Sequence, residues 1–409
     1  MVKGYKKTEI GLLPQNWEVK TIGKISTPKA RIGWQNLRKE EYMESGLYML
    51  ITGTDFEDGR VNYSTCKFVS ENRYEQDPNI QVKNGNVLVT KDGTLGKVAI
   101  IKGLNFKATL NAGVFVLGNL SSSINNEFLY QYLSTNRLMK YAERTSTGGT
   151  IQHLNQGVLV DFPIPVPPVE EQARIAAALS DIDDLIIKSE ELIKKYQTMK
   201  QGCLQHMFPR NGQTEPDMRL PGFSGAWEQR KLGEVATFIN GRAYKQSELL
   251  NYGKYKVLRV GNFYTNDAWY YSNLELEDKY YIEKGDLVYT WSATFGPHIW
   301  NGEKVIYHYH IWKIKLSEYL DRDFTLQILE ADKAKLLSST NGSTMIHVTK
   351  DDMESKNISL PSIDEQKKIG IFLMKIDNLI ALHQRKREKY KMIKQGMMED
   401  LLTGKVRLK

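Results

Sequence analysis

Two stretches of this sequence read almost alike. Residues 163–186 are PIPVPPVEEQARIAAALSDIDDLI, and residues 357–380 are NISLPSIDEQKKIGIFLMKIDNLI. In each stretch proline precedes an acidic pair and a glutamine, and apolar residues then recur at intervals of four, three and four. Proline suits the first turn of a helix, acidic side chains suit its dipole, and this apolar spacing is typical of a helix that packs against another helix. The sequence therefore predicts two long, similar helices that pair with each other.

The similarity extends into the segments before the helices. Trp17 returns as Trp227, an offset of 210 residues, and His153 returns as His347, an offset of 194. Through the helices the offset stays at 194. Coincidences that follow one another in order over about 190 residues indicate an internal duplication.

The duplication divides the chain into four segments. They are a head domain at residues 1–166, a long helix at 167–208, a second head domain at 209–360 and a second long helix at 361–409. The heads are rich in β-forming residues, glycine and turns, with shorter helices mixed in. The expected fold is α+β, with two mixed α/β heads alternating with two long helices that pair as an antiparallel coiled coil. Pseudo-two-fold symmetry would relate the halves, and the helices, about 55–60 Å long, would hold the heads apart.

Composition limits the class of protein. The chain has 409 residues, 41% hydrophobic and 25% charged, which is typical of a folded protein of two or three domains. Its net charge of +8 favours a polyanionic partner, although this cue is weak alone. The N-terminal residues lack a signal sequence and no apolar run is long enough to span a membrane, so we expect a cytoplasmic protein without membrane contact.

Catalytic and metal-binding motifs are absent from the sequence. Two cysteines cannot supply a disulfide framework or a four-thiolate metal site. No phosphate loop, dinucleotide fingerprint, zinc-helix spacing or nucleophile elbow occurs. His308 and His310 alternate on an expected strand and are interpreted as packed or exposed strand residues rather than metal ligands. The sequence favours a non-catalytic binding or scaffolding protein with no metal or cofactor of its own.

The arrangement resembles the specificity subunit of type I restriction–modification systems, and the resemblance covers nearly the whole chain. It rests on GYKKTEIGLLPQNWEVKTIGKI (4–25), its counterpart LPGFSGAWEQRKLGEVATFINGRAY (220–244), GNVLVTKDGTLGKVAI (85–100), TSTGGTIQHL (145–154) and the twice-found helix start. The second half departs modestly, with Pro–Ser in place of Pro–Pro and WSATFG in place of KDGTLG.

The resemblance implies a definite function. Each head would be a target recognition domain that reads one half of an asymmetric, bipartite site on double-stranded DNA. The helices would set the spacer and dock two methyltransferase subunits, which bind S-adenosylmethionine. Motor-nuclease subunits using ATP and magnesium would complete the complex. The alternative is a non-enzymatic helical-rod adaptor that joins two protein partners, with the positive charge incidental.

Candidate DNA contacts are basic, polar and aromatic residues of loops, because cations bind phosphates and polar side chains read base edges. They are Lys29, Arg31, Trp34, Arg60, Lys91, Thr94, Lys97, Arg144, Thr147, Gln152, His153, Arg242, Tyr244, Lys245, Arg259, Asn262, Trp291, His298, Ser343, Thr344 and His347. Any one of these cations could instead be merely solvated, and Trp34 and Trp291 could equally be core. Candidates for the helix start or for subunit docking are Glu171, Gln172, Glu365 and Gln366. Trp17 and Trp227 are expected to pack in the interior.

Overall fold

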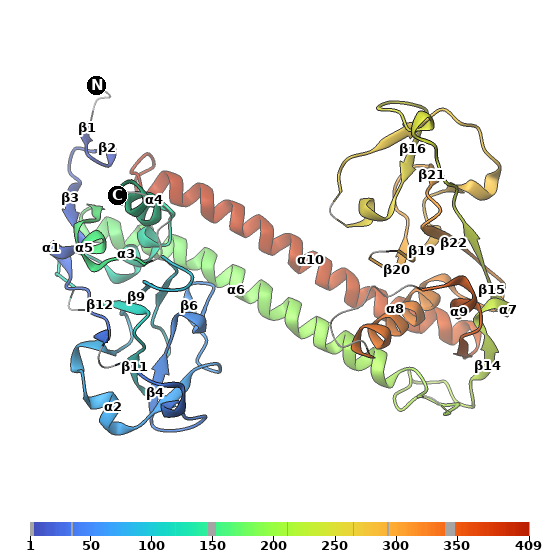
Figure 1. Ribbon diagram of the computed structural model, residues 1–409, viewed down its shortest axis with the longest axis horizontal. Coiled ribbons are helices and arrows are strands. Elements are labelled where there is room, and N and C mark those ends of the chain that lie inside the picture. Colours follow the sequence, from blue (N-terminus) through green and yellow to red (C-terminus); the bar gives the residue numbers. More distant parts are fainter. Residues whose placement is uncertain are drawn as a thin grey trace. The chain divides into compact units, whose positions relative to one another are not determined.

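The structure, a computed structural model, describes residues 4–33, 36–118, 120–145, 153–210, 212–264, 266–292, 294–339 and 348–408. The chain forms two compact units (Figure 1). Unit 1 comprises Met1–Glu190 and Gln384–Lys409, and unit 2 comprises Glu191–His383. Each unit therefore holds one head together with part of both long helices.

The two predicted long helices are present. Helix α6 spans Val169–His206 and helix α10 spans Ile363–Leu401, with 38 and 39 residues. Each begins just after a proline or a Pro–Ser pair and carries two acidic residues in its first turn, where the helix dipole favours negative charge. The predicted fold class, mixed α/β heads with two long helices that pack together, is confirmed.

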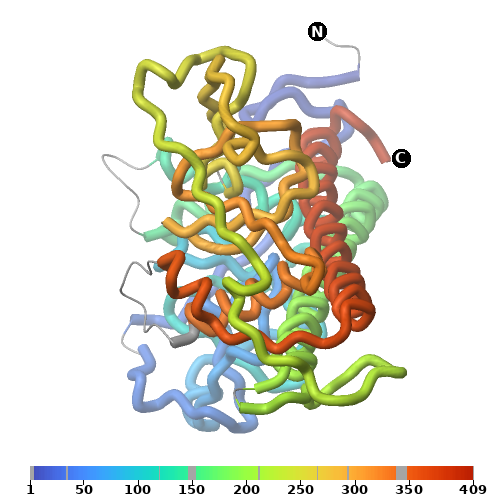
Figure 2. The backbone as a smooth tube through the Cα atoms, turned by 90° about the vertical axis from the view of Figure 1, so that its right-hand side faces the viewer, coloured from blue at the N-terminus to red at the C-terminus, as the bar shows by residue number. Residues whose placement is uncertain are grey.

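In unit 1 the helix segments run antiparallel. Lys394 of α10 pairs with Asp183 of α6 at 2.6 Å, and Lys391 pairs with Glu190 at 3.2 Å. A later residue of α6 thus meets an earlier residue of α10. The segments lie side by side in both views (Figures 1 and 2).

Unit 2 repeats this pairing with the helices exchanged. Lys200 of α6 pairs with Asp377 of α10 at 2.7 Å, and the Tyr196 ring stacks on His383 with centroids 5.8 Å apart. The direction is again antiparallel.

The apolar seam is buried most deeply where each helix begins. Ile175 and Leu179 of α6 are fully buried in unit 1, and Leu373 of α10 is fully buried in unit 2. Later seam positions are core only in part, since Ile193 of α6 is 7% exposed whereas Ile393 of α10 is 38% exposed. The early turns belong to the core of a head, which explains their deep burial.

The described residues of the head of unit 1 form two sheets of three or more strands. One has the order β7–β4–β11–β8, with a parallel central pair β4/β11 and antiparallel outer pairs. The other, β10–β9–β12, is antiparallel. The strands are β4 Tyr48–Ile51, β7 Lys67–Val69, β8 Gln81–Val82, β9 Val87–Thr90, β10 Val98–Ile100, β11 Lys107–Leu110 and β12 Val114–Leu117. All residues of β9 and β12 are buried, which explains their continuous apolar sequences.

The head of unit 2 repeats this order. Its first sheet is β17–β16–β21–β18, again with a parallel central pair, and its second is β15–β22–β19–β20. The strands are β15 Ala236–Asn240, β16 Tyr255–Leu258, β17 Tyr270–Ser272, β18 Tyr281–Ile282, β19 Leu287–Thr290, β20 Gly296–Ile299, β21 Val305–Tyr307 and β22 Ile311–Leu316. The added strand β15 takes the place of a single bridge between Lys29 and Val116 in unit 1. Equal strand order in both heads is what a duplicated sequence would produce.

Shorter elements connect the sheets to the long helices. In unit 1 they are β1 Tyr5–Thr8, β2 Gly11–Pro14, β3 Glu18–Thr21, α1 Ile22–Ile25, β5 Phe56–Glu57, β6 Arg60–Val61, α2 Glu71–Glu75, α3 Asn126–Leu133, α4 Arg137–Thr145, α5 Gln156–Asp161 and β13 Pro163–Val166. In unit 2 they are β14 Glu228–Lys231, α7 Leu232–Val235, α8 Arg322–Ser339, α9 Lys350–Glu354 and β23 Asn357–Leu360. Strand β13 pairs with β3, and β23 pairs with β14, so each long helix follows directly from an anchored strand.

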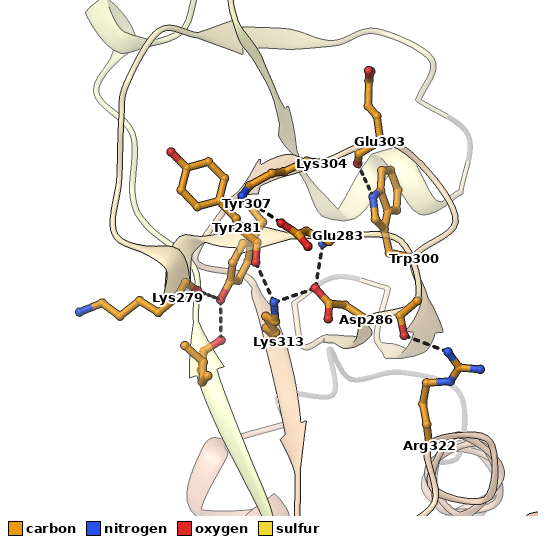
Figure 3. A network of polar contacts seen from close by, with 12 residues as sticks. Lys279, Tyr281, Glu283, Asp286, Trp300, Glu303, Lys304, Tyr307, Lys313 and Arg322 are labelled. Carbon is orange, nitrogen blue, oxygen red and sulfur yellow. Dashed lines mark hydrogen bonds and ion pairs between the residues drawn. The ribbon is translucent and has the colours of Figure 1, made fainter.

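A polar network joins the two sheets of the second head (Figure 3). Lys313 of β22 pairs with Asp286 at 2.7 Å and donates to the carbonyl of Tyr281 at 3.0 Å. The Tyr307 hydroxyl of β21 donates to the carbonyls of Lys279 and Ile239 at 2.8 and 3.2 Å. These contacts pair polar groups of the two sheets and tie the sheets to each other.

Candidate nucleic-acid interface

The glutamine of the first helix start ties the helix to its head. Gln172 is fully buried. Its side-chain oxygen accepts from the amide of Asn125 at 2.8 Å, and its nitrogen donates to the carbonyls of Ser123 and Pro167 at 2.9 and 2.8 Å. These bonds satisfy backbone groups of the segment that enters α3.

Gln366 repeats these contacts in unit 2. Its oxygen accepts from the amide of Asp321 at 2.9 Å, and its nitrogen donates to the carbonyls of Tyr319 and Pro361 at 2.9 and 3.0 Å. Two glutamines at equivalent positions thus connect the start of each long helix to its head in the same way.

The neighbouring glutamates are also buried and paired. Arg407 contacts both carboxylate oxygens of Glu171 at 2.5 and 2.6 Å, and the Trp17 indole donates to the same carboxylate at 3.1 Å. In unit 2, Arg219 contacts both oxygens of Glu365 at 2.8 Å. None of the four helix-start residues is more than 4% exposed. They hold the base of each head together, and they offer no surface on which a partner could dock.

Trp17 and Trp227 are buried, as predicted. Trp17 belongs to the core at the base of unit 1, and Trp227 to the core at the base of unit 2. Their equivalent positions reflect equivalent packing.

The loops at one edge of the first head are joined by backbone hydrogen bonds. The amide of Lys91 donates to the carbonyl of Gly113, and the amide of Leu154 donates to the carbonyl of Lys91, both at 2.9 Å. His153 Nδ1 lies 2.5 Å from Asp92 Oδ1. The turn after β9, the turn before β12 and the segment before α5 therefore meet.

Basic residues occur in these turns and in the elements next to them in the sequence. Lys29, Lys97 and Arg144 are exposed, and Lys91 is half-buried over the Phe115 ring at 5.6 Å. No described carboxylate forms an ion pair with any of these four cations. We call Lys29, residues 91–97 and 111–113, Arg144 and His153 loop edge 1. Thr94 belongs to it as an exposed residue whose carbonyl accepts from Thr90.

The corresponding loops of the second head are rich in aromatic residues. The amide of Trp291 donates to the carbonyl of His310 at 3.1 Å, and its indole donates to the carbonyl of Tyr309 at 2.9 Å. The amide of Tyr309 donates to the carbonyl of Arg242 at 3.1 Å. We call Arg242, Lys245, Arg259, Trp291 and residues 308–310 loop edge 2. Tyr309 is 38% exposed, so an aromatic surface reaches solvent there.

Histidines of the second head are kept neutral. Burial, with a smaller effect of Lys333, lowers the pKa of His298 to about 4. Burial, followed by the charges of His310 and Arg259, lowers the pKa of His308 to about 4. At neutral pH these side chains carry hydrogen-bonding groups without positive charge.

Arg31 is buried, which corrects its prediction as a DNA contact. It is 1% exposed, and its guanidinium donates to the carbonyl of Leu110 at 3.0 Å and to Thr109 Oγ1 at 3.2 Å. It therefore binds the strand β11 from inside the head.

Four further candidates have partners within their own unit. Arg60 pairs with Asp184 of α6. Arg242 contacts both oxygens of Glu248 at 2.8 and 3.2 Å, and its guanidinium lies 5.3 Å from the Tyr244 ring centre. These contacts neutralise the two arginines and turn them toward the protein.

The half-buried Tyr244 and Asn262 also face inward. The Tyr244 hydroxyl lies 3.4 Å from the carbonyl of Tyr307, and burial raises the pKa of Tyr244. Asn262 donates to the carbonyls of Asn266 and Ala268 at 2.9 and 3.0 Å. Both side chains shape their loops.

Other candidates differ in their surroundings. Lys245 is exposed, and Arg259 lies over the Tyr270 ring at 4.2 Å. Lys97 lines a cavity of about 330 Å³ beside α6 and α10 in unit 1. His298 and Asn262 line a cavity of about 500 Å³ in unit 2.

Six further candidates lie outside the described residues and stay predictions. They are Trp34, Thr147, Gln152, Ser343, Thr344 and His347.

The sequence missed part of both edges. His308 and His310 do not alternate on a strand, because residues 308–310 form the turn between β21 and β22. The alternating YHYHIW pattern concealed that turn, whereas its counterpart at 111–113 contains Gly113, a turn signal. Asp92 and Tyr309 carry no signal in the sequence that marks them as part of these edges, since neither residue type is diagnostic alone.

Among the described residues, no cluster of three or more His, Cys, Asp and Glu side chains could hold a metal ion. No helix in the described ranges is both long and apolar enough to cross a bilayer.

Comparison with known proteins identifies relatives along the whole chain. The family model described as the type I restriction modification DNA specificity domain matches residues 14–197 and 225–391. The type I restriction enzyme MjaVIII specificity subunit of Methanocaldococcus jannaschii is 26% identical, over 97% of this chain and 94% of that protein.

Solved structures share the fold. The type I restriction–modification S subunit of M. genitalium has a TM-score of 0.61 and 16% identity, covering 94% of this chain and 96% of that chain. A chain from a study of assembly and conformational transition in a type I system has a TM-score of 0.52 and 17% identity, covering 96% and 99%.

Proposed function

This chain belongs to the family of type I restriction–modification DNA specificity subunits, which are not catalytic, and we propose that it selects an asymmetric, two-part site on double-stranded DNA. Each head, within residues 1–166 and 209–360, reads one part. The helices, within residues 167–208 and 361–409, set the unread spacer.

One observation carries this proposal. The two heads have the same strand order, yet loop edges 1 and 2 place different side chains at equivalent turns. Lys91 follows strand β9, whereas Trp291 follows the equivalent strand β19. One fold with two surfaces is suited to reading two different sequences, since base readout depends on a few side chains at groove edges.

Affinity is expected to depend on salt. Lys29, Lys91, Lys97 and Arg144 at loop edge 1 can each neutralise a phosphate, and the released counterions make log K fall as log salt rises. Loop edge 2, with neutral histidines and a paired Arg242, supplies less charge and more aromatic contact. The two heads would then contribute unequally to the salt dependence.

The outer faces of the long helices are the proposed docking surface for two methyltransferase subunits. A groove on α10 is lined by Gln384, Arg385, Glu388, Lys389, Met392 and Ile393. Met392 is 74% exposed, and Leu185 of α6 is 39% exposed. Apolar side chains exposed on a helix suit burial against a partner helix. S-adenosylmethionine, ATP and magnesium would belong to the methyltransferase and motor-nuclease partners.

A methylome tests the proposal. The chain is expressed with its cognate methyltransferase in a host without adenine methylation, and N6-methyladenine is mapped by single-molecule sequencing. We expect one split motif with two defined parts and a fixed gap. A soluble complex whose methyltransferase is active but whose methylation is absent, or follows one continuous motif, would contradict the proposal.

Lengthening both helices tests the spacer role. Four residues are inserted after Glu190 in α6 and four after His383 in α10, at the boundary between the units, so that the contacts inside each unit are kept. Four helical residues add about 6 Å. We expect the gap to lengthen by about one or two base pairs, at about 3.4 Å each, with both parts of the motif unchanged. Altered parts around an unchanged gap would contradict the spacer role.

A further inference from the structure

Three elements of unit 1 meet at one carboxylate. Gln131 of α3 donates to Asp183 Oδ2 of α6 at 2.7 Å, and Lys394 of α10 pairs with Asp183 Oδ1 at 2.6 Å. Gln131 is fully buried, and the Asp183 and Lys394 side chains are 13% and 16% exposed. We call these residues triad 1. It joins the head to both long helices.

Unit 2 contains the same arrangement. Gln327 of α8 donates to Asp377 Oδ2 of α10 at 3.1 Å, and Lys200 of α6 pairs with Asp377 Oδ1 at 2.7 Å. We call these residues triad 2. In both triads the aspartate comes from the helix that follows the head, and the lysine comes from the other helix. The helices therefore exchange roles between the units.

The contacts of a triad can form in only one register of α6 against α10. A shift of one residue along a helix moves a side chain by about 1.5 Å and turns it by about 100°. Either displacement would separate the lysine from the aspartate, and in triad 1 it would leave charges in a poorly hydrated site, where unpaired charge is unfavourable. Single buried polar contacts are known to fix the register of paired helices at a cost in stability.

The bonding of Gln131 and Gln327 indicates that the triads select one arrangement of the helices rather than add stability. The side-chain oxygens of Gln131 and Gln327 are both buried and accept no hydrogen bond from the described residues. An apolar side chain would fill either position without this unfavourable burial. The same incomplete bonding occurs in both units, as expected if the contact selects an arrangement.

We propose that triads 1 and 2 are positioning devices that fix the orientation of each head on the helices and the register of α6 against α10. This inference rests on the proposed function. It adds that the triads determine how faithfully the spacer is kept, and that they have no part in choosing the bases read.

The test replaces triad 1 by apolar residues of similar size, Gln131→Met, Asp183→Leu and Lys394→Met. Removing the whole charge pair leaves no unpaired ion, so folding is expected to persist. In the methylome, we expect sites whose gap is wrong by one base pair to increase about tenfold, corresponding to about 1.4 kcal/mol less discrimination between registers. Both parts of the motif should be unchanged.

The matched control is the pair Lys356→Met with Asp332→Leu. These side chains are each 25% exposed and lie 2.8 Å apart, but they join two parts of the second head without touching a long helix. The control should keep a single gap length. A merely structural loss would lower total methylation in both variants without changing the gap.

A conservative variant covers the case in which the triple variant does not fold. Gln131→Met alone keeps the Asp183–Lys394 ion pair and removes only the contact from the head, and we expect a smaller increase in wrong gaps. If either folded variant keeps the gap as faithfully as the natural chain, the inference is wrong. Failure of the proposed function is distinct, because the natural chain itself would then give no split motif.

Discussion

Loop edges 1 and 2 occupy the same place in two copies of one fold and have different chemistry. At loop edge 1, Lys91 and the Asp92–His153 pair give a charged surface. At loop edge 2, Trp291, Tyr309 and His310 give an aromatic one. The helix starts behind them have the same glutamine contacts in both units. The side chains at the helix starts are constrained by their contacts inside the protein. The side chains at a loop edge are constrained instead by the molecule that the edge binds.

The largest expected effect comes from the helix-start arginines. Arg219→Ala leaves Glu365 buried without its cation, which should destabilise unit 2 by about 3–5 kcal/mol. Arg407→Ala should destabilise unit 1 less, because the Trp17 indole still donates to Glu171. The Trp227 indole N–H has no hydrogen-bond acceptor among the described residues. Amide hydrogen exchange measured separately in each unit gives the two free energies of opening.

An exposed ion pair is the control for that comparison. Lys254 and Glu275 pair with side chains 57% and 64% exposed. Such pairs contribute about 0–1 kcal/mol, so Lys254→Ala should leave exchange in unit 2 nearly unchanged. Equal losses from Arg219→Ala and Arg407→Ala would show that the indole contact does not distinguish the two units.

Substitutions at loop edges 1 and 2 should weaken DNA binding in different ways. Trp291→Ala is expected to weaken DNA binding by about 1–3 kcal/mol through lost apolar contact at the interface, with little change in the salt slope. Lys91→Met should weaken binding less and reduce the salt slope by about one. Affinity of the methyltransferase complex, titrated at several salt concentrations, measures both. A reduced slope for Trp291→Ala would contradict the proposed difference.

The smallest effect concerns pH. The pKa of His298 is about 4 in the folded protein, below the usual value of about 6.5. Between these values the unfolded chain binds more protons, so stability is complete above pH 6.5 and falls as the pH drops toward 4. We expect unit 2 to lose about 1 kcal/mol between pH 7 and pH 5.5 from this group. Hydrogen exchange should show that His298→Gln loses less stability over this pH range than the natural chain. An equal loss of stability in both would exclude this histidine as the cause.

The helices and the duplication could be predicted because they depend on local spacing. Proline, acidic residues and an apolar stripe specify a helix start within a few residues. The inward orientation of Gln172 could not be predicted, because its partners at Ser123 and Asn125 lie nearly fifty residues earlier. Arg31 illustrates the same limit, since an arginine in a loop reads as a surface cation until strand β11 is seen to enclose it.

The base of unit 1 depends on residues from both ends of its range. The Tyr5 hydroxyl donates to the carbonyl of Gly404 at 2.9 Å, and Arg407 reaches Glu171. Unit 2, residues 191–383, lies between those parts in the chain. A ribosome adding about 5–20 residues per second needs about 10–40 s to make it. The second head can therefore complete its fold first. Until residues 384–409 have been made, Trp17 at the base of the first head stays uncovered and accessible to chaperones.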